Sequence, residues 1–127
     1  QNIFFDGQIY DAYSFVNDLI KLAKSEIVLI DNYIDDTVFT LFSKYPNINF
    51  TIYTSTISKQ LKLDFEKYSK QYKNISLKTF KSSHDRFLII DKKEIYHLGA
   101  SLKDLGKKWF AFSKMSFDID LIFNRLK

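Results

Sequence analysis

Cysteine is absent from this sequence, and no hydrophobic run approaches the length of a membrane span. Without cysteine, a thiolate zinc site and a dithiol redox motif are excluded. A membrane helix needs roughly 20 consecutive apolar residues, so no membrane partner is predicted. Internal repeats and low-complexity tracts are also missing, and the two histidines do not have the spacing of a metal site. No metal ion or other cofactor is expected.

The sequence does contain enough apolar material for one hydrophobic core. Its 127 residues are 46% hydrophobic and 17% aromatic, which suits a globular domain that folds without disulfides. Residues 1–127 are therefore predicted to form a single domain. The N-terminus has no signal-peptide pattern, and the chain starts at Gln1. We expect a cytoplasmic domain excised from a longer protein, whose other domains are among its partners.

Charge is distributed unevenly along the chain. Residues 1–50 contain seven acidic and three basic residues, a net charge of −4. Residues 51–127 contain eight acidic and sixteen basic residues, a net charge of +8. This excess of lysine and arginine favours an anionic partner for the second part of the chain. For any single lysine, such as those between residues 59 and 73, a solvated helix surface is the commoner explanation.

Helix-like and strand-like segments alternate in the first half of the chain. Hydrophobic periodicity predicts helices over 11–24, 37–45 and 58–72, and strands over 3–5, 26–31, 49–54 and 75–80. The expected N-caps of the helices are Asp11, Asp36 and Ser58. A pair of adjacent strands follows within 84–101, and 117–126 fits either helix or strand. This order predicts an α/β fold, a mixed β-sheet flanked by helices on both faces.

Polar residues follow the predicted strand 26–31. Asp31, Asn32 and Asp35 lie at its carboxyl end, which is where ligand-contacting residues collect in open α/β sheets. Carboxylates at such positions also serve as helix caps. Both interpretations, pocket residues and helix caps, remain open from the sequence.

The most informative stretch runs from His84 to Asp91 and continues through 94–101. Residues two apart on a strand point to the same side, roughly 6.6–7 Å apart, so His84 and Arg86 are expected to face the same space. An imidazole that titrates near neutral pH beside a permanent guanidinium suits phosphate chemistry. Asp91 is too far along the strand to orient His84, and we expect a structural role for it, closing a turn or pairing with a base. His97 is expected to be a packing histidine.

The pattern His-x-Arg-x-x-x-x-Asp formed by His84, Arg86 and Asp91, with Gly99 and Ser101 after it, resembles the signature of the phospholipase D superfamily. The resemblance implies a phospholipase D-like fold and a phosphodiesterase or nuclease in which a histidine attacks phosphorus without metal. Its catalytic residues would be His84, Arg86 and Ser101. Because this chain has one copy of the motif, the resemblance also implies a homodimer that shares its active site.

The sequence departs from that family in two respects. Lys103 stands where the family has asparagine, and the family's downstream carboxylate has no clear counterpart. The alternative is therefore a catalytically degenerate module for DNA binding or dimerisation in a larger protein. In either case nucleic acid is the expected partner. Supporting residues are expected at Asp91, Asp31, Asn32 and Lys103, and nucleic-acid contacts at Lys103, Lys107, Lys108 and Trp109.

Overall fold

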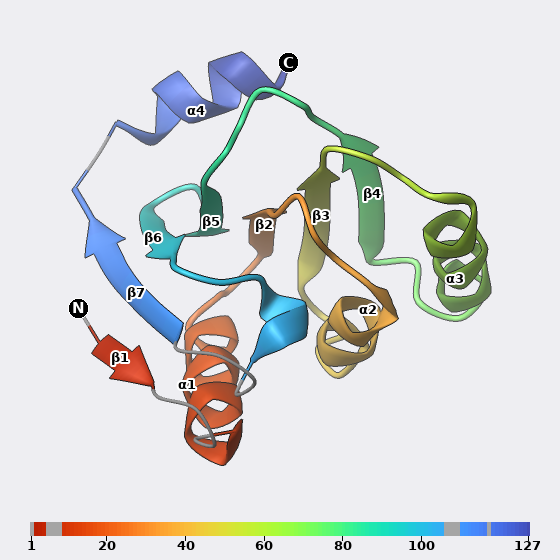
Figure 1. Cartoon of the computed structure of the whole chain (residues 1–127), viewed down its shortest axis with the longest axis horizontal. Helices are drawn as coiled ribbons and strands as arrows, with labels where there is room; N and C mark the ends of the chain where they lie inside the picture. The colour runs from red at the N-terminus through yellow and green to blue at the C-terminus, as the bar shows by residue number, and fades with distance from the viewer. Residues whose placement is uncertain (1, 5–8, 106–109, 117) are drawn as a thin grey trace.

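A single β-sheet runs through the molecule, with helices packed against both of its faces (Figure 1). The computed structural model describes residues 2–4, 9–105, 110–116 and 118–127. Along the chain the elements are β1 (Asn2–Phe4), α1 (Ile9–Lys21), β2 (Glu26–Ile30), α2 (Asp36–Ser43), β3 (Asn49–Thr54), α3 (Lys59–Ser69), β4 (Ile75–Thr79), β5 (Arg86–Ile90), β6 (Glu94–Leu98), the 3₁₀ turn η1 (Leu102–Asp104), β7 (Phe110–Met115) and α4 (Ile119–Leu126). The predicted α/β class with a mixed sheet is confirmed.

The order of the strands in the sheet is β1-β7-β6-β5-β2-β3-β4. β2, β3 and β4 pair in parallel, because α2 and α3 provide the crossovers between them. The remaining neighbours pair antiparallel, beginning with β5 beside β2. Consequently the carboxyl ends of β2 and β3 and the amino end of β5 lie at the same edge of the sheet.

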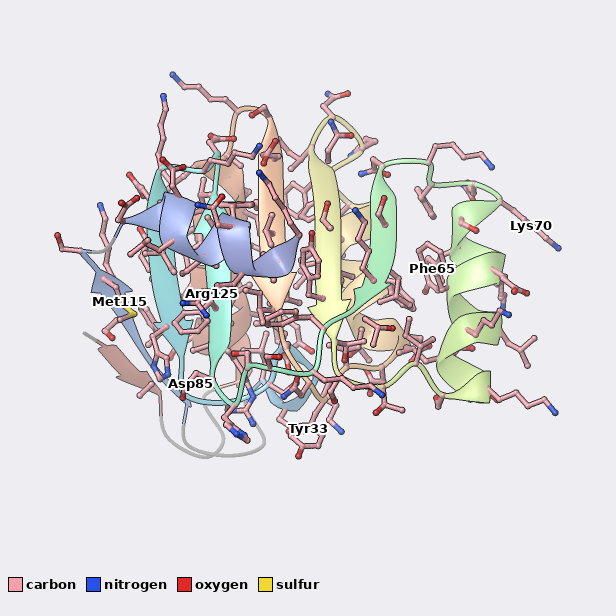
Figure 2. All side chains as sticks on the ribbon, turned by 90° about the horizontal axis from the view of Figure 1, so that it is seen from above. Tyr33, Phe65, Lys70, Asp85, Met115 and Arg125 are labelled. Carbon is pink, nitrogen blue, oxygen red and sulfur yellow. The ribbon has the colours of Figure 1, made fainter. Side chains whose placement is uncertain are left out.

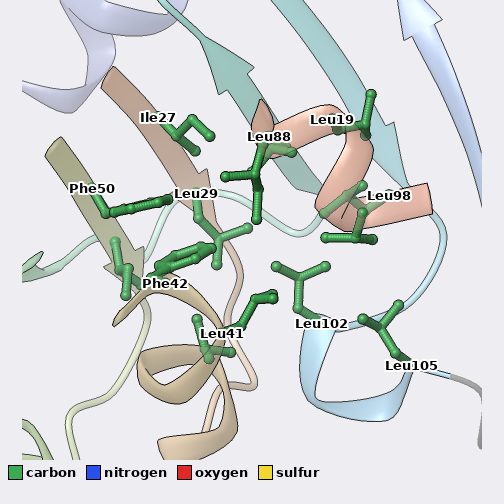
Figure 3. Packing of buried hydrophobic residues seen from close by; sticks show 14 of the residues in the cluster. Leu19, Ile27, Leu29, Leu41, Phe42, Phe50, Leu88, Leu98, Leu102 and Leu105 are labelled. Atoms are coloured by element: carbon green, nitrogen blue, oxygen red, sulfur yellow. The ribbon is translucent and has the colours of Figure 1, made fainter. Parts of the chain in front are cut away.

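Side chains alternate between two hydrophobic layers, one on each face of the sheet. In the larger layer, Leu29 and Phe50 pack against α1 and α2 (Figure 3), and the ring of Phe42 stacks on Phe50 with centroids 4.1 Å apart. In the smaller layer, Val28 lies in one cluster with Ile119 of α4. β2 is therefore buried on both faces, which is why its sequence is a continuous apolar run.

The ends of the helices differ in detail from the sequence prediction. α1 begins before Asp11, which therefore lies inside the first turn instead of capping the helix. Asp35, not Asp36, is the N-cap of α2. Ser58 caps α3 as predicted, and the ambiguous segment 117–126 contains a helix, α4. None of the helices in the described ranges is long and apolar enough to cross a membrane.

The strand β7 is not apparent from periodicity, and it forms because it pairs with β6 and β1. Gly99 directly follows β6 and lies against the backbone of Ala111 in β7. The backbone N–H of Gly99 donates to the carbonyl oxygen of Ala111 at 2.6 Å, and a Cβ added at Gly99 would lie only 2.8 Å from that oxygen. Any side chain here would push the two segments apart, so the close approach requires glycine.

Asp91 fastens the turn between β5 and β6 to the start of β2. Both Asp91 and Lys92 have positive φ, 52° and 55°. The Asp91 carboxylate accepts hydrogen bonds from the backbone N–H groups of Lys24, Ser25 and Glu26 at 2.8–2.9 Å. Hydrogen bonds from Glu26 and Lys24 lower the pKa of the Asp91 carboxyl, because they stabilise its ionised form.

This geometry predicts that Asp91→Asn lowers the free energy of unfolding at pH 7 by about 2 kcal/mol. A depressed native pKa contributes stability that is present above the unfolded value of about 3.9 and is lost as the pH falls below it. The difference in the free energy of unfolding between wild type and Asp91→Asn should therefore be smaller at pH 3 than at pH 7. Urea unfolding at pH 7 and pH 3 measures both values, with Glu66→Gln on the exposed side of α3 as the control. An equal difference in unfolding free energy at the two pH values would contradict this account.

Candidate functional site

Polar side chains replace apolar ones where β5, β2 and β3 reach the same edge of the sheet. β2 pairs with β5 and β3 as far as Ile30, which lies opposite Phe87 and Tyr53. Asp31, the next residue, therefore follows β2 at the level of Arg86 and Thr54. Ser101, from the segment after β6, joins them. We call these four residues the polar edge. Asp31, Thr54 and Ser101 are buried, so this is a polar group inside the protein and not a surface patch.

Asp31 is the centre of the polar edge. Its carboxylate accepts hydrogen bonds from the hydroxyl of Ser101 at 2.8 Å and from the backbone N–H groups of Leu102 and Tyr33 at 3.1 Å. The Nε atom of Arg86 lies 3.7 Å from the same carboxylate. These contacts tie the end of β2 to the start of β5 and to η1, three segments far apart in sequence.

Burial and hydrogen bonding act on Asp31 in opposite directions. Removal from water raises the pKa of the Asp31 carboxyl, while the hydrogen bonds from Tyr33, Ser101 and Leu102 and the charge of Arg86 act to lower it. Burial is the largest of these effects. A buried carboxylate is costly unless several donors surround it, so these partners are expected to stabilise the fold.

Not every polar atom at this edge has a partner. The Nε atom of Arg86, the hydroxyl of Thr54 and the side-chain oxygen of Asn32 are buried without a hydrogen bond to the described protein atoms. The amide nitrogen of Asn32 does donate, to the carbonyl oxygen of Ser83 at 2.6 Å. The polar edge thus retains unused hydrogen-bonding capacity, concentrated at the ends of β2, β3 and β5.

The residues predicted to be catalytic are only partly brought together. Arg86 and Ser101 both contact Asp31. The guanidinium carbon of Arg86 lies 5.9 Å from the centroid of the Tyr33 ring. His84 is exposed and precedes β5, outside the strand that holds Arg86. Tyr33 and Asp85 lie at this end of the sheet in Figure 2.

The neighbouring polar side chains form local contacts. The Nε2 atom of His97 lies 3.4 Å from the Asp85 carboxylate, and its ring meets Phe87 edge to face with centroids 5.6 Å apart. Lys103 is half-buried in η1. The other three residues expected to contact nucleic acid, Lys107, Lys108 and Trp109, lie outside the described residues. Within the described ranges, no group of three or more His, Asp or Glu side chains is arranged to hold a metal ion.

A second candidate region lies on the opposite face of the sheet, beside α4. It is a pocket of about 390 Å³ whose cationic residues are Lys78, Lys92 and Lys127, and whose aromatic residues are Tyr53 and Phe123. We call it the basic groove. Asp120 is its only acidic lining residue among those described, and Asn124 adds an amide.

The lysines of the basic groove sit close to its aromatic rings. The Nζ atom of Lys78 lies 6.0 Å from the Tyr53 ring centroid, and that of Lys92 lies 5.3 Å from the Phe123 centroid. Lys92 also lies 4.0 Å from the carboxylate of Glu26, although both side chains remain open to solvent. These distances are those of cation–π contacts, which hold the ammonium groups beside flat apolar surfaces.

The basic groove is not apparent from the sequence, because its residues come from four separate segments. The sequence contains one signal for it, the alternation along 75–80, which places Lys78 on one face of that strand. Pairing with the strand 49–54 then places Lys78 opposite Tyr53. The contribution of α4 was not accessible in this way, because 117–126 fitted helix and strand equally well.

Comparisons with known proteins give a similarity of fold only. No family model matches the chain, and no curated protein matches it. Among solved structures it is similar to TrmBL2, an archaeal chromatin protein whose structure shows a novel mode of DNA binding. The TM-score is 0.59 at 15% sequence identity, and the match covers 98% of this chain and 48% of TrmBL2. The chain therefore spans about half the length of that protein.

These findings correct the predicted family. Membership of the phospholipase D superfamily is wrong, since no family model matches and the structural similarity is to a chromatin protein. The expected phospholipase D-like form of the α/β fold is likewise not supported. The spacing of His84, Arg86 and Asp91 remains in the sequence, but Arg86 pairs with Asp31 and Asp91 holds the β5–β6 turn at the other end of the strand.

The geometry of the polar edge predicts a cost for Ser101→Ala. Removing the hydroxyl takes one donor from a buried carboxylate, so the free energy of unfolding should fall by roughly 1–3 kcal/mol. Ser82→Ala, in the exposed segment before β5, is the matched control and should change it by less than about 0.5 kcal/mol. Chemical denaturation measures both, and equal effects would show that the Asp31 network does not stabilise the fold.

Proposed function

We propose that this chain is a non-catalytic nucleic-acid-binding module of a larger protein, and that the basic groove contacts the sugar–phosphate backbone. The single observation that carries the proposal is the convergence of Lys78, Lys92 and Lys127 around two aromatic rings in one groove. Phosphate neutralisation by lysine supplies most non-specific nucleic-acid affinity. Tyr53 and Phe123 are half-buried, and the open part of such rings beside lysines adds sequence-tolerant stacking with bases.

The fold similarity to TrmBL2 supports the choice of DNA as the first ligand to test. The charge asymmetry supports it as well, because all three lysines of the groove come from the part of the chain with a net charge of +8. No base-specific contact is proposed, since lysine ammonium groups act as point charges and read phosphate, not sequence. Binding is therefore expected to be largely independent of sequence and strongly dependent on salt.

The arrangement of the polar edge favours a structural role over catalysis. Its cation lies beside a buried carboxylate, and His84 is exposed in the segment before β5. A phosphate at Arg86 would compete with Asp31 for the same guanidinium. Self-association and association with other domains of the parent protein stay predictions, which sedimentation of the isolated chain and of the full-length protein would measure.

The double variant Lys78→Ala/Lys92→Ala should weaken DNA binding roughly tenfold. It should also reduce the magnitude of the slope of log K against log salt by about 1.8, because each lost phosphate contact on duplex DNA accounts for about 0.9. Fluorescence anisotropy with a labelled duplex across a salt series measures both quantities. The matched control is Lys62→Ala/Lys67→Ala, which removes the same charge from exposed positions on α3, a helix that packs on the other layer.

Thermal unfolding of both double variants checks that neither has lost its fold. Equal slopes and affinities for the two would show that binding follows net charge and not the basic groove. A wild-type protein without salt-dependent DNA binding would overturn the proposed function itself.

A further inference from the structure

A second pocket lies on the other side of α4, at the edge of the sheet near the start of β5. Its volume is about 310 Å³, at the lower end of the range of roughly 300–1,000 Å³ for small-molecule sites. Ile30 and Phe87 of the sheet form its floor, and Leu121 and Ile122 of α4 form a wall. We call it the apolar pocket. It shares Leu126 with the basic groove, but its chemistry is different.

Part of the apolar surface around this pocket is exposed to solvent, and a bound ligand would cover it. Leu121 is 55% exposed although it borders the pocket. Phe80, just after β4, contributes a ring that is only half-buried. Ile119 is the only buried residue of α4, so much of the apolar side of this helix is covered incompletely.

Two lining residues carry polar side-chain groups, and only one of them is available to a ligand. The hydroxyl of Ser83 already donates to the carbonyl oxygen of Asp85 at 2.8 Å. Arg125 is exposed and has no carboxylate within 4.0 Å among the described residues. In Figure 2 it projects from α4. A permanent guanidinium at the rim of an apolar pocket selects a ligand with an apolar body and one anionic end.

We propose that the apolar pocket binds a small amphipathic carboxylate, with the hydrocarbon part between α4 and the sheet and the carboxylate paired to Arg125. The site borders the basic groove at Leu126, but it does not depend on the proposed nucleic-acid binding. Burial of methylene groups drives the association, at a factor of about four in affinity per methylene. The guanidinium makes the site prefer an acid over the alcohol of the same chain length.

The test is calorimetric titration of the whole chain with octanoate, decanoate and decanol, each kept below its aggregation concentration. Wild type should bind decanoate saturably, octanoate on the order of tenfold more weakly, and decanol more weakly than decanoate. Arg125→Leu should remove the preference for the acid while keeping the binding of decanol. Leu121→Asp should abolish decanoate binding, since it adds a like charge and a polar group at the mouth of the pocket.

Leu63→Asp is the matched control, because Leu63 is also a half-exposed leucine on a helix, 54% exposed on α3. It should bind decanoate as wild type does. Both leucines and Arg125 are exposed, so the variants are expected to fold, and thermal unfolding checks this. The proposal is overturned if wild type does not bind decanoate at millimolar concentration, if Arg125→Leu keeps the preference for the acid, or if Leu121→Asp and Leu63→Asp bind alike.

Discussion

The buried carboxylate of Asp31 is the constraint on which the polar end of this fold depends. A charge removed from water must be compensated. Asp31 accepts hydrogen bonds from Ser101 and Leu102 after β6 and from Tyr33 after β2, and the Arg86 cation at the start of β5 lies 3.7 Å away. β2 is also the strand at which parallel pairing changes to antiparallel pairing. The same residue therefore fixes where β2 ends and where β5 begins.

A corresponding role is played at the other end of β5 by Asp91. It accepts hydrogen bonds from the backbone that leads into β2, while Asp31 lies at the exit of that strand. The two carboxylates thus fasten β2 to β5 at opposite ends. Their environments differ, because hydrogen bonds dominate at Asp91 and lower its pKa, whereas burial dominates at Asp31 and raises it.

The two hydrophobic layers differ in how completely helices cover them, and both proposed binding regions lie on the less covered face. α1, α2 and α3 pack on the larger layer, whereas the other face is covered only in part by the short helix α4. α4 separates the basic groove, where lysines lie beside aromatic rings, from the apolar pocket, where a single arginine borders hydrocarbon. A partly covered sheet face beside one short helix offers space that a fully covered face would not.

The sequence alone determined the α/β class, because the buried run of β2 and the alternation in β3 and β4 are local patterns. It also placed the Ser58 cap and the polar residues at the end of β2. It could not determine the partner of Arg86, since the spacing from His84 to Asp91 says nothing about a carboxylate 55 positions earlier in the chain. The aromatic strand β7 and the basic groove were likewise decided only by tertiary structure. Both depend on pairing between segments distant in sequence, and that pairing sets which faces and charges meet.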